Sequence, residues 1–77
     1  MTREEVLKKL HYFSEEILRI GIEAVRPQTR FADVGLDSLD MAEMESYIEE
    51  WISVPIGRSL PQTYGEAADL ILKACRP

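Results

Sequence analysis

The sequence has little of what most catalytic and metal-binding sites require. Its 77 residues include one histidine, His11, and one cysteine, Cys75, so we expect no internal disulfide and no His/Cys metal cluster. Nothing around Cys75 indicates an activated thiol, and we interpret it as a bystander. His11 falls within a helical pattern and is expected to pack or to face solvent.

Long apolar runs are missing as well. The first ten residues, MTREEVLKKL, carry charges through the first helical turns, so they predict neither a signal peptide nor a transmembrane span. We therefore expect a cytoplasmic protein without a membrane partner. The formal net charge of −5 would be repelled by phosphates, which argues against nucleic acid as a partner.

The composition is typical of a small folded domain. Hydrophobic residues make up 45% of the chain and charged residues 30%, values that a disordered chain does not reach together. A domain of this size buries only about 60% of its unfolded surface, so one simple core is expected. Residues 1–77 are therefore predicted to form a single domain, and we expect it to be a monomer.

Helical periodicity first appears at residues 3–20. Thr2 and Glu5 form a capping-box pattern before it, and Gly21 is placed to end it. The apolar residues that recur at helical spacing are Val6, Leu10, Phe13, Ile17 and Ile20.

A second helix is predicted from Ser38 to Ile52. Asp37 is a favourable N-cap, and Asp40 places a carboxylate in the first turn, where the helix dipole favours it. One arc of this helix holds Met41, Met44, Tyr47, Ile48, Trp51 and Ile52. The opposite, polar arc holds Glu43, Glu45, Ser46, Glu49 and Glu50, with Leu39 among them.

The rest of the chain connects these helices and adds a third. Residues 21–37 have no period and form a long loop anchored by single apolar residues, or a loop that contains a short helical turn. The prolines and glycine of residues 53–62 exclude a long helix but allow one turn around Arg58 to Leu60. Thr63 and Glu66 form a second capping-box pattern before a helix at 64–75. The predicted fold is all-α, a bundle of three main helices.

The acidity of the chain is local. No basic residue lies between Arg30 and Arg58, and this interval holds seven acidic ones, so the remaining residues sum to +2. An acidic helix face is most often simply solvated. Here a lysine four residues after a glutamate would have relieved the repulsion, and none is present. A serine and a leucine are also exposed at the same helix start, which favours a docking surface.

Two chemical readings of this region can be set aside. A serine hydrolase would need a base and an orienting acid for Ser38, but the chain has one histidine and no G-x-S-x-G elbow. A calcium loop starting at Asp33 would need a glutamate at its twelfth position, which is Met44.

An Asp-Ser-Leu triplet stands at the start of the acidic helix, just after a glycine. The run around it comprises Phe31, Gly35, Leu36, Asp37, Ser38, Leu39, Asp40 and Glu43. This run resembles the acyl carrier protein family, in which the serine is esterified by 4′-phosphopantetheine from coenzyme A. The resemblance implies Ser38 as the attachment site, and the chain length, helix order and long first loop correspond as well.

The resemblance also implies how the chain would work. It would be a carrier and not an enzyme, tethering acyl intermediates as thioesters in a specialised fatty acid, lipid or polyketide pathway. Its partners would be a phosphopantetheinyl transferase and an acyl ligase, ketosynthase or acyltransferase with a basic docking surface. The implied partner-binding residues are Asp37, Leu39, Asp40, Glu43, Glu45, Glu49 and Glu50. The core residues implied to admit the acyl chain are Met41, Met44, Ile48 and Trp51.

The chain departs from the family at two places. Pro55 precedes Ile56 where the family has an isoleucine-proline pair, and Glu45 and Ser46 occupy positions that are commonly apolar. Both departures indicate a specialised carrier. Two alternatives remain open: an aminoacyl or peptidyl carrier of the same fold, and an acidic-helix interaction module without a prosthetic group.

Overall fold

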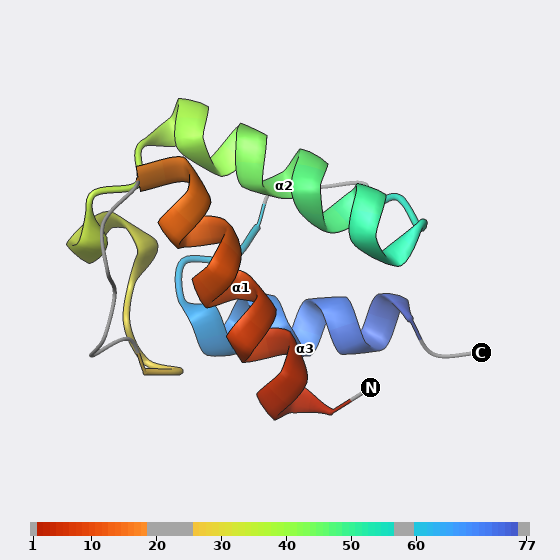
Figure 1. Cartoon of the computed structure of the whole chain (residues 1–77). Coiled ribbons are helices and arrows are strands. Elements are labelled where there is room, and N and C mark those ends of the chain that lie inside the picture. The colour runs from red at the N-terminus through yellow and green to blue at the C-terminus, as the bar shows by residue number, and fades with distance from the viewer. Residues whose placement is uncertain (1, 19–25, 57–59, 76–77) are drawn as a thin grey trace.

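The computed structural model describes residues 2–18, 26–56 and 60–75 (Figure 1). In chain order its elements are α1 (Arg3–Leu18), the 3₁₀ helix η1 (Phe31–Val34), α2 (Ser38–Ile52) and α3 (Tyr64–Ala74). The described residues contain no strand, only one isolated antiparallel bridge between Arg30 and Thr63. The predicted all-α bundle of three main helices is confirmed.

The helices begin where the sequence predicts because their capping groups are in place. The hydroxyl of Thr2 accepts from the N–H of Glu5 at 3.2 Å, and the Glu5 carboxylate accepts from the N–H of Thr2 at 3.3 Å. At α3 the hydroxyl of Thr63 accepts from the N–H of Glu66 at 3.1 Å. The expected return bond to the Thr63 N–H is not formed there, and the Glu66 carboxylate accepts from the Thr63 hydroxyl at 2.9 Å.

The ends of the elements can be compared only in part. Helix α2 ends at Ile52 as predicted, and α3 ends at Ala74, one residue before the predicted end. The predicted end of the first helix at residue 20, its stop at Gly21 and most of the turn allowed around Arg58 to Leu60 lie outside the described residues. In the long first loop, the alternative with a short helical turn is correct, since η1 lies there.

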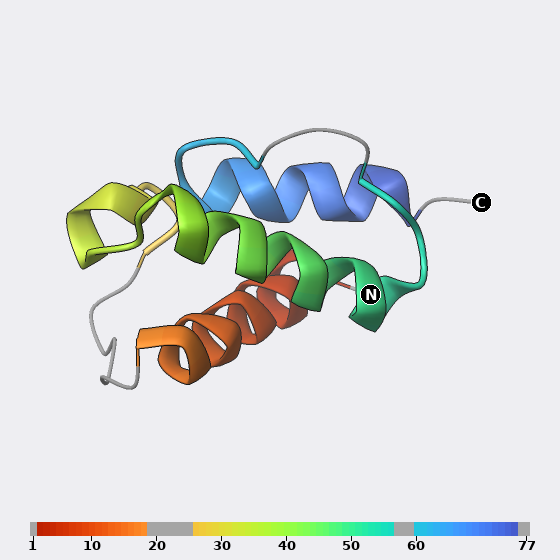
Figure 2. The ribbon, with the colours of Figure 1, turned by 90° about the horizontal axis from the view of Figure 1, so that it is seen from above.

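Helix α1 packs against both other helices (Figure 2). Their apolar faces share one core, which also takes in two residues of the loop before α2. Its fully or almost fully buried members are Val6, Leu10, Phe13, Phe31, Leu36, Met44, Ile48, Tyr64, Ala67, Ala68 and Ile71. The helical stripes predicted from the sequence therefore face this core wherever they are described, whereas the side chains of Ile17 and Ile20 lie outside the described part.

The segment before η1 runs alongside the start of α3. Three backbone N–H···O bonds join Phe31 to Gln62, Tyr64 to Thr29 and Gly65 to Pro27, at 2.9, 3.1 and 2.7 Å. The approach is so close that a Cβ at Gly65 would lie 2.9 Å from the carbonyl oxygen of Pro27. Only glycine fits at this position without a backbone shift. This pairing places the loop that leads to α2.

An aromatic cluster covers the outer side of the contact between α1 and α2. The rings of Phe13 and Tyr47 stack at 5.4 Å, and Trp51 meets Phe13 edge-on at 6.2 Å. The Lys9 ammonium group lies 5.2–5.7 Å from the ring centres of Tyr12, Phe13 and Trp51. These contacts hold α1 to α2 with a cation–π contribution.

One polar pair is enclosed in the core between α1 and α3. The hydroxyls of Ser14 and Tyr64 lie 2.8 Å apart, and the Ser14 hydroxyl also donates to the carbonyl of Leu10 at 2.9 Å. Burial raises the pKa of Tyr64, an effect only partly offset by the bond to Ser14, so the phenol stays neutral. His11 packs edge-on against the same ring at 5.6 Å, so of the two roles expected for it, packing and exposure to solvent, it has the packing role.

The Ser14–Tyr64 pair predicts unequal costs for its two deletions. Ser14→Ala leaves the phenol hydroxyl buried without its partner and should destabilise the fold by about 1–3 kcal/mol. Tyr64→Phe should cost less, because Ser14 keeps its bond to Leu10. The double variant should cost less than the sum of the two single changes. Urea unfolding of all four proteins measures this, and strictly additive costs would contradict the coupling.

Candidate functional site

Ser38 is the first residue of α2 and follows directly on its N-cap. The side chain of Asp37 accepts from the N–H of Asp40 at 2.9 Å, and the Asp40 carboxylate accepts from the N–H of Asp37 at 3.2 Å. This reciprocal capping box is stronger than the single N-cap that the sequence predicted. Ser38 itself is exposed, and its hydroxyl has no hydrogen bond to any described residue.

The short helix η1 delivers this helix start to the surface. It ends at Val34 and is followed by Gly35, whose φ of 93° lies in the left-handed region that glycine adopts at little cost. The N–H of Leu36 then bonds back to the carbonyl of Phe31 at 3.1 Å, and both side chains are buried. The loop is thus anchored in the core on one side of the capping box and turns outward at Asp37. Ser38 projects from a fixed point and not from a loose segment.

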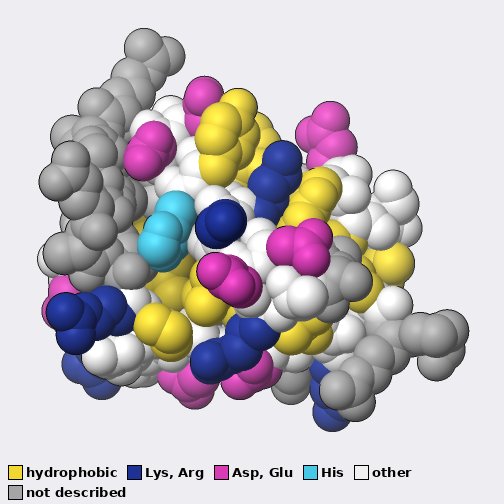
Figure 3. Space-filling view, turned by 60° about the horizontal axis from the view of Figure 1, so that its bottom comes forward, with side chains coloured by type: hydrophobic (Ala, Val, Ile, Leu, Met, Phe, Trp, Pro, Cys, Tyr) yellow, Lys and Arg dark blue, Asp and Glu magenta, His cyan; other side chains and the backbone are white. Residues whose placement is uncertain are grey.

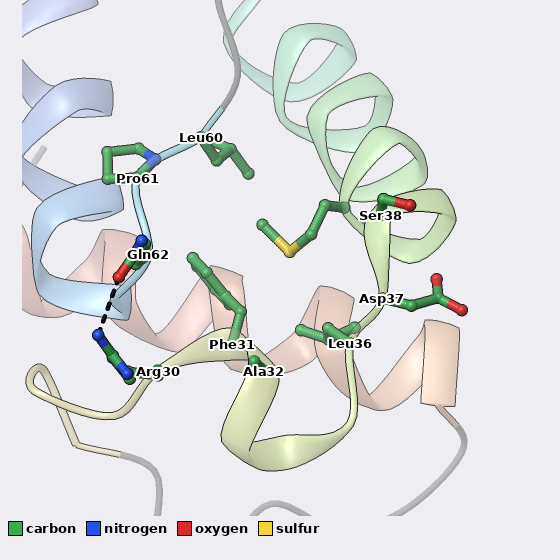
Figure 4. A pocket seen from close by; sticks show the side chains of 10 residues that line it. Arg30, Phe31, Ala32, Leu36, Asp37, Ser38, Leu60, Pro61 and Gln62 are labelled. Carbon is green, nitrogen blue, oxygen red and sulfur yellow. Dashed lines mark hydrogen bonds between the residues drawn. The ribbon is translucent and has the colours of Figure 1, made fainter.

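A cleft of about 360 Å³ lies beside Ser38 (Figure 4). Its walls come from the segment around η1, the first turn of α2 and the segment that precedes α3. The lining residues are Arg30, Phe31, Ala32, Leu36, Asp37, Ser38, Met41, Leu60, Pro61 and Gln62. The Ser38 and Asp37 side chains stand at its rim and point away from its interior (Figure 4). A group attached to Ser38 therefore begins outside the cleft and has it directly alongside.

The four residues predicted to admit an acyl chain do not line one preformed cavity. Met44 and Ile48 are fully buried in the closed core. Met41 lines the cleft beside Ser38, whereas Trp51 lines a separate depression between α1 and α2. A chain that entered between Met44 and Ile48 would have to separate packed side chains.

The residues predicted to bind partners differ in how far they are exposed to solvent. Leu39 is 77% exposed and lines a shallow groove of about 420 Å³ with Ala42, Glu43 and Ser46. Glu50 is exposed too, whereas Glu45 is half-buried.

Glu49 has a structural contact of its own. Its carboxylate accepts from the N–H of Ile56 at 2.8 Å and so holds the segment that follows α2. The face that carries α1 and α3, in contrast, mixes basic and acidic side chains (Figure 3). The acidic surface therefore belongs to α2.

Some of the cleft could not be found from the sequence. Phe31 and Leu36 stand out there as single apolar anchors, but Arg30 and Gln62 lie 32 residues apart in irregular segments. They meet only because the loop pairs with the start of α3, and no local pattern signals that pairing.

The described residues offer little chemistry beyond this serine. They contain no group of three or more His, Cys, Asp or Glu side chains placed to hold a metal ion. None of the helices in the described part of the chain is long and apolar enough to span a membrane. A small helical bundle that presents one exposed serine on a capped helix start has the design of a carrier domain.

Comparison with known proteins agrees with this class. Residues 14–70 match the family described as the phosphopantetheine attachment site. Over 57 residues the chain is 40% identical to the acyl carrier protein of Cyanidium caldarium, an alignment that covers 73% of this chain and 66% of that relative. The chain thus spans slightly less than two thirds of the relative's length. It belongs to the phosphopantetheine attachment site family, whose cofactor is covalent 4′-phosphopantetheine, and it is similar to an acyl carrier protein.

The capping box predicts a measurable contribution to stability. Asp37→Ala removes the N-cap side chain and should lower the free energy of unfolding by about 1 kcal/mol, whereas Asp37→Asn should retain most of the stability, since asparagine caps equally well. Glu50→Ala, on the exposed face of α2, should change it by no more than about 0.5 kcal/mol. Urea titration followed by circular dichroism compares the three variants. Equal costs for Asp37→Ala and Glu50→Ala would refute the role of the cap.

Proposed function

We propose that Ser38 is the residue of this chain that carries the phosphopantetheine arm. The observation that supports this most is the exposed serine hydroxyl, free of described partners, on a rigidly capped helix start. The first N–H groups of α2 and its positive dipole end suit the phosphate that Ser38 would acquire. The cleft alongside leaves room for the group attached to it.

In the loading reaction the chain supplies only the nucleophile. The hydroxyl oxygen of Ser38 attacks the β-phosphorus of coenzyme A, a new P–O bond forms, and the bond to the departing adenosine 3′,5′-bisphosphate breaks. The hydroxyl proton passes to a base of the transferase, since the neighbouring carboxylates of Asp37 and Asp40 are engaged by backbone N–H groups and form no hydrogen bond with the Ser38 hydroxyl. Once attached, the arm holds acyl groups as thioesters through its terminal thiol. Tethering keeps them at an effective concentration that can reach about the mM range.

The groove on α2 is the proposed docking surface for partner enzymes. Leu39 offers an apolar contact in it, and Glu43 lines it with a negative charge, whereas the exposed Glu50 lies outside it, farther along α2. A basic surface on the phosphopantetheinyl transferase, or on an acyl ligase, ketosynthase or acyltransferase, complements that charge. Asp37 and Asp40 extend the acidic region to the attachment site.

We further propose that the carrier serves a specialised fatty acid, lipid or polyketide pathway. Ser46 lines the α2 groove at a position that is commonly apolar in the family, and Glu45 is half-buried beside it. Polar groups at these positions remove apolar contacts that a general fatty acid synthase enzyme would use. One such contact can be worth about 1 kcal/mol, or roughly fivefold in affinity.

Loading of Ser38 can be tested by intact mass spectrometry. Incubation with coenzyme A and a phosphopantetheinyl transferase should add one phosphopantetheine to the wild type and none to Ser38→Ala. Ser53→Gly is the matched control, because it removes another exposed hydroxyl, just after α2 and outside the docking groove, and should still be loaded. An unmodified wild type would favour the interaction module without a prosthetic group, and a modified Ser38→Ala would assign the arm to another residue.

Docking through α2 predicts different salt responses for two variants. Glu43→Lys should slow loading severalfold at low salt and less at high salt, because exposed charges are screened beyond about 8–10 Å at physiological ionic strength. Leu39→Ala should slow it to a similar extent at every salt concentration. Glu4→Lys, a charge reversal at the far end of α1, is the control and should load normally. The same salt response for Glu43→Lys and Leu39→Ala would rule out charge steering.

A further inference from the structure

The cleft beside Ser38 has one apolar part and one polar end. Phe31 and Leu60 provide apolar walls between Ser38 and the far side (Figure 4), and Met41 also lines the cleft. At the far side the Arg30 guanidinium donates to the side-chain oxygen of Gln62 at 3.1 Å. A ligand that suits this cleft is therefore apolar where it enters and polar where it ends.

The polar end of the cleft has hydrogen-bond donors that the bond between Arg30 and Gln62 does not use. An arginine side chain carries five N–H donors and a glutamine amide two, whereas the bond between them uses one donor and the amide oxygen. No other side-chain hydrogen bond joins Arg30 or Gln62 to a described residue. What this end offers a ligand is a set of N–H groups, which call for hydroxyl or carbonyl oxygens.

The backbone keeps Arg30 and Gln62 close together. The N–H of Phe31 bonds to the carbonyl of Gln62 at 2.9 Å, and Arg30 faces Thr63 in the isolated bridge. The two side chains therefore start from paired backbone positions. Because their backbones are already paired, binding of a ligand would cost little entropy for bringing the two residues together.

We propose that this cleft holds the first half of the phosphopantetheine arm itself. This inference rests on Ser38 as the attachment site. After its phosphate the arm carries a dimethyl-substituted carbon, then a hydroxyl and an amide carbonyl. The dimethyl carbon packs between Phe31, Met41 and Leu60, and the two oxygens accept from Arg30 and Gln62. The charged phosphate stays in solvent at the start of α2, outside the rim.

The size of the cleft agrees with this occupant. Its volume of about 360 Å³ equals roughly twelve water-sized groups, and this half of the arm has about ten non-hydrogen atoms. A plain hydrocarbon chain could fill the apolar part but would leave the donors of Arg30 and Gln62 unused. The cargo is attached at the other end of the arm, and the first half of the arm is already about enough to fill the volume of the cleft. Arg30 and Gln62 are thus positioning residues that fold the arm back along the protein.

The test is an isotope-filtered NMR experiment on the holo protein. The protein is labelled with ¹³C and ¹⁵N, and the arm is added unlabelled from coenzyme A. Nuclear Overhauser contacts should join the two arm methyl groups to the Met41 methyl and the Phe31 ring. Attachment of the arm should also raise the melting temperature by about 3 °C relative to the apo protein.

Two variants distinguish a specific site from a passing contact. Arg30→Met removes the donor but keeps an unbranched side chain, and it should lose most of the methyl contacts and the gain in melting temperature. Arg26→Met, an exposed arginine of the same segment that does not line the cleft, should keep both. Equal behaviour of the two variants would overturn the proposal.

The outcomes also separate this inference from the proposed function. A mass shift that shows a loaded Ser38, with no contacts between the arm methyls and the cleft, overturns the inference and leaves the carrier function intact. Contacts from a loaded hexanoyl chain in place of the arm methyls would make the cleft a cargo site and overturn it too. Failure to load the wild type at all would instead contradict the proposed function.

Discussion

The pairing of residues 27–31 with residues 62–65 is the constraint on which the rest of the structure depends. It is a short stretch of backbone hydrogen bonding between two irregular segments, and it requires a residue without a side chain at Gly65. This pairing holds residues 27–31 against the start of α3. Phe31 is then fixed in the core, η1 follows, and α2 begins at a defined point. The position of Ser38 is thus decided by contacts made far from it in sequence.

The start of α2 combines two electrostatic arrangements in the same residues. Asp37 and Asp40 satisfy backbone N–H groups of the first turn, which stabilises the helix. They also place negative charge next to the proposed attachment site, where a basic partner would approach. A phosphate on Ser38 is attracted by the helix end and repelled by the two carboxylates. The helix end and the two carboxylates would therefore act on this phosphate in opposite directions, and a positive charge beside it would have to come from a partner.

Local patterns in the sequence were sufficient for the helices and for the exposed serine. Helical periodicity and capping residues predicted where α1, α2 and α3 begin, because both act within a few residues of the chain. These local patterns could not predict the cleft. Its walls depend on the pairing of two segments without periodicity, and Met41 turned out to be the only member of the predicted acyl-chain set that lines it. Packing against distant segments decided this, and one helix cannot reveal it.

The contacts that each acidic side chain makes in the folded protein change the conformational entropy that it would lose on forming an ion pair with a partner. Asp37 and Asp40 are already held in single conformations by their backbone bonds, and Glu49 is held by Ile56. Glu43 and Glu50 are exposed and keep their rotamer freedom. Ordering a free glutamate costs up to about 2 kcal/mol of conformational entropy, whereas a carboxylate that folding has already ordered adds no such cost. Asp37, Asp40 and Glu49 are therefore entropically cheaper for a partner to bind than Glu43 and Glu50.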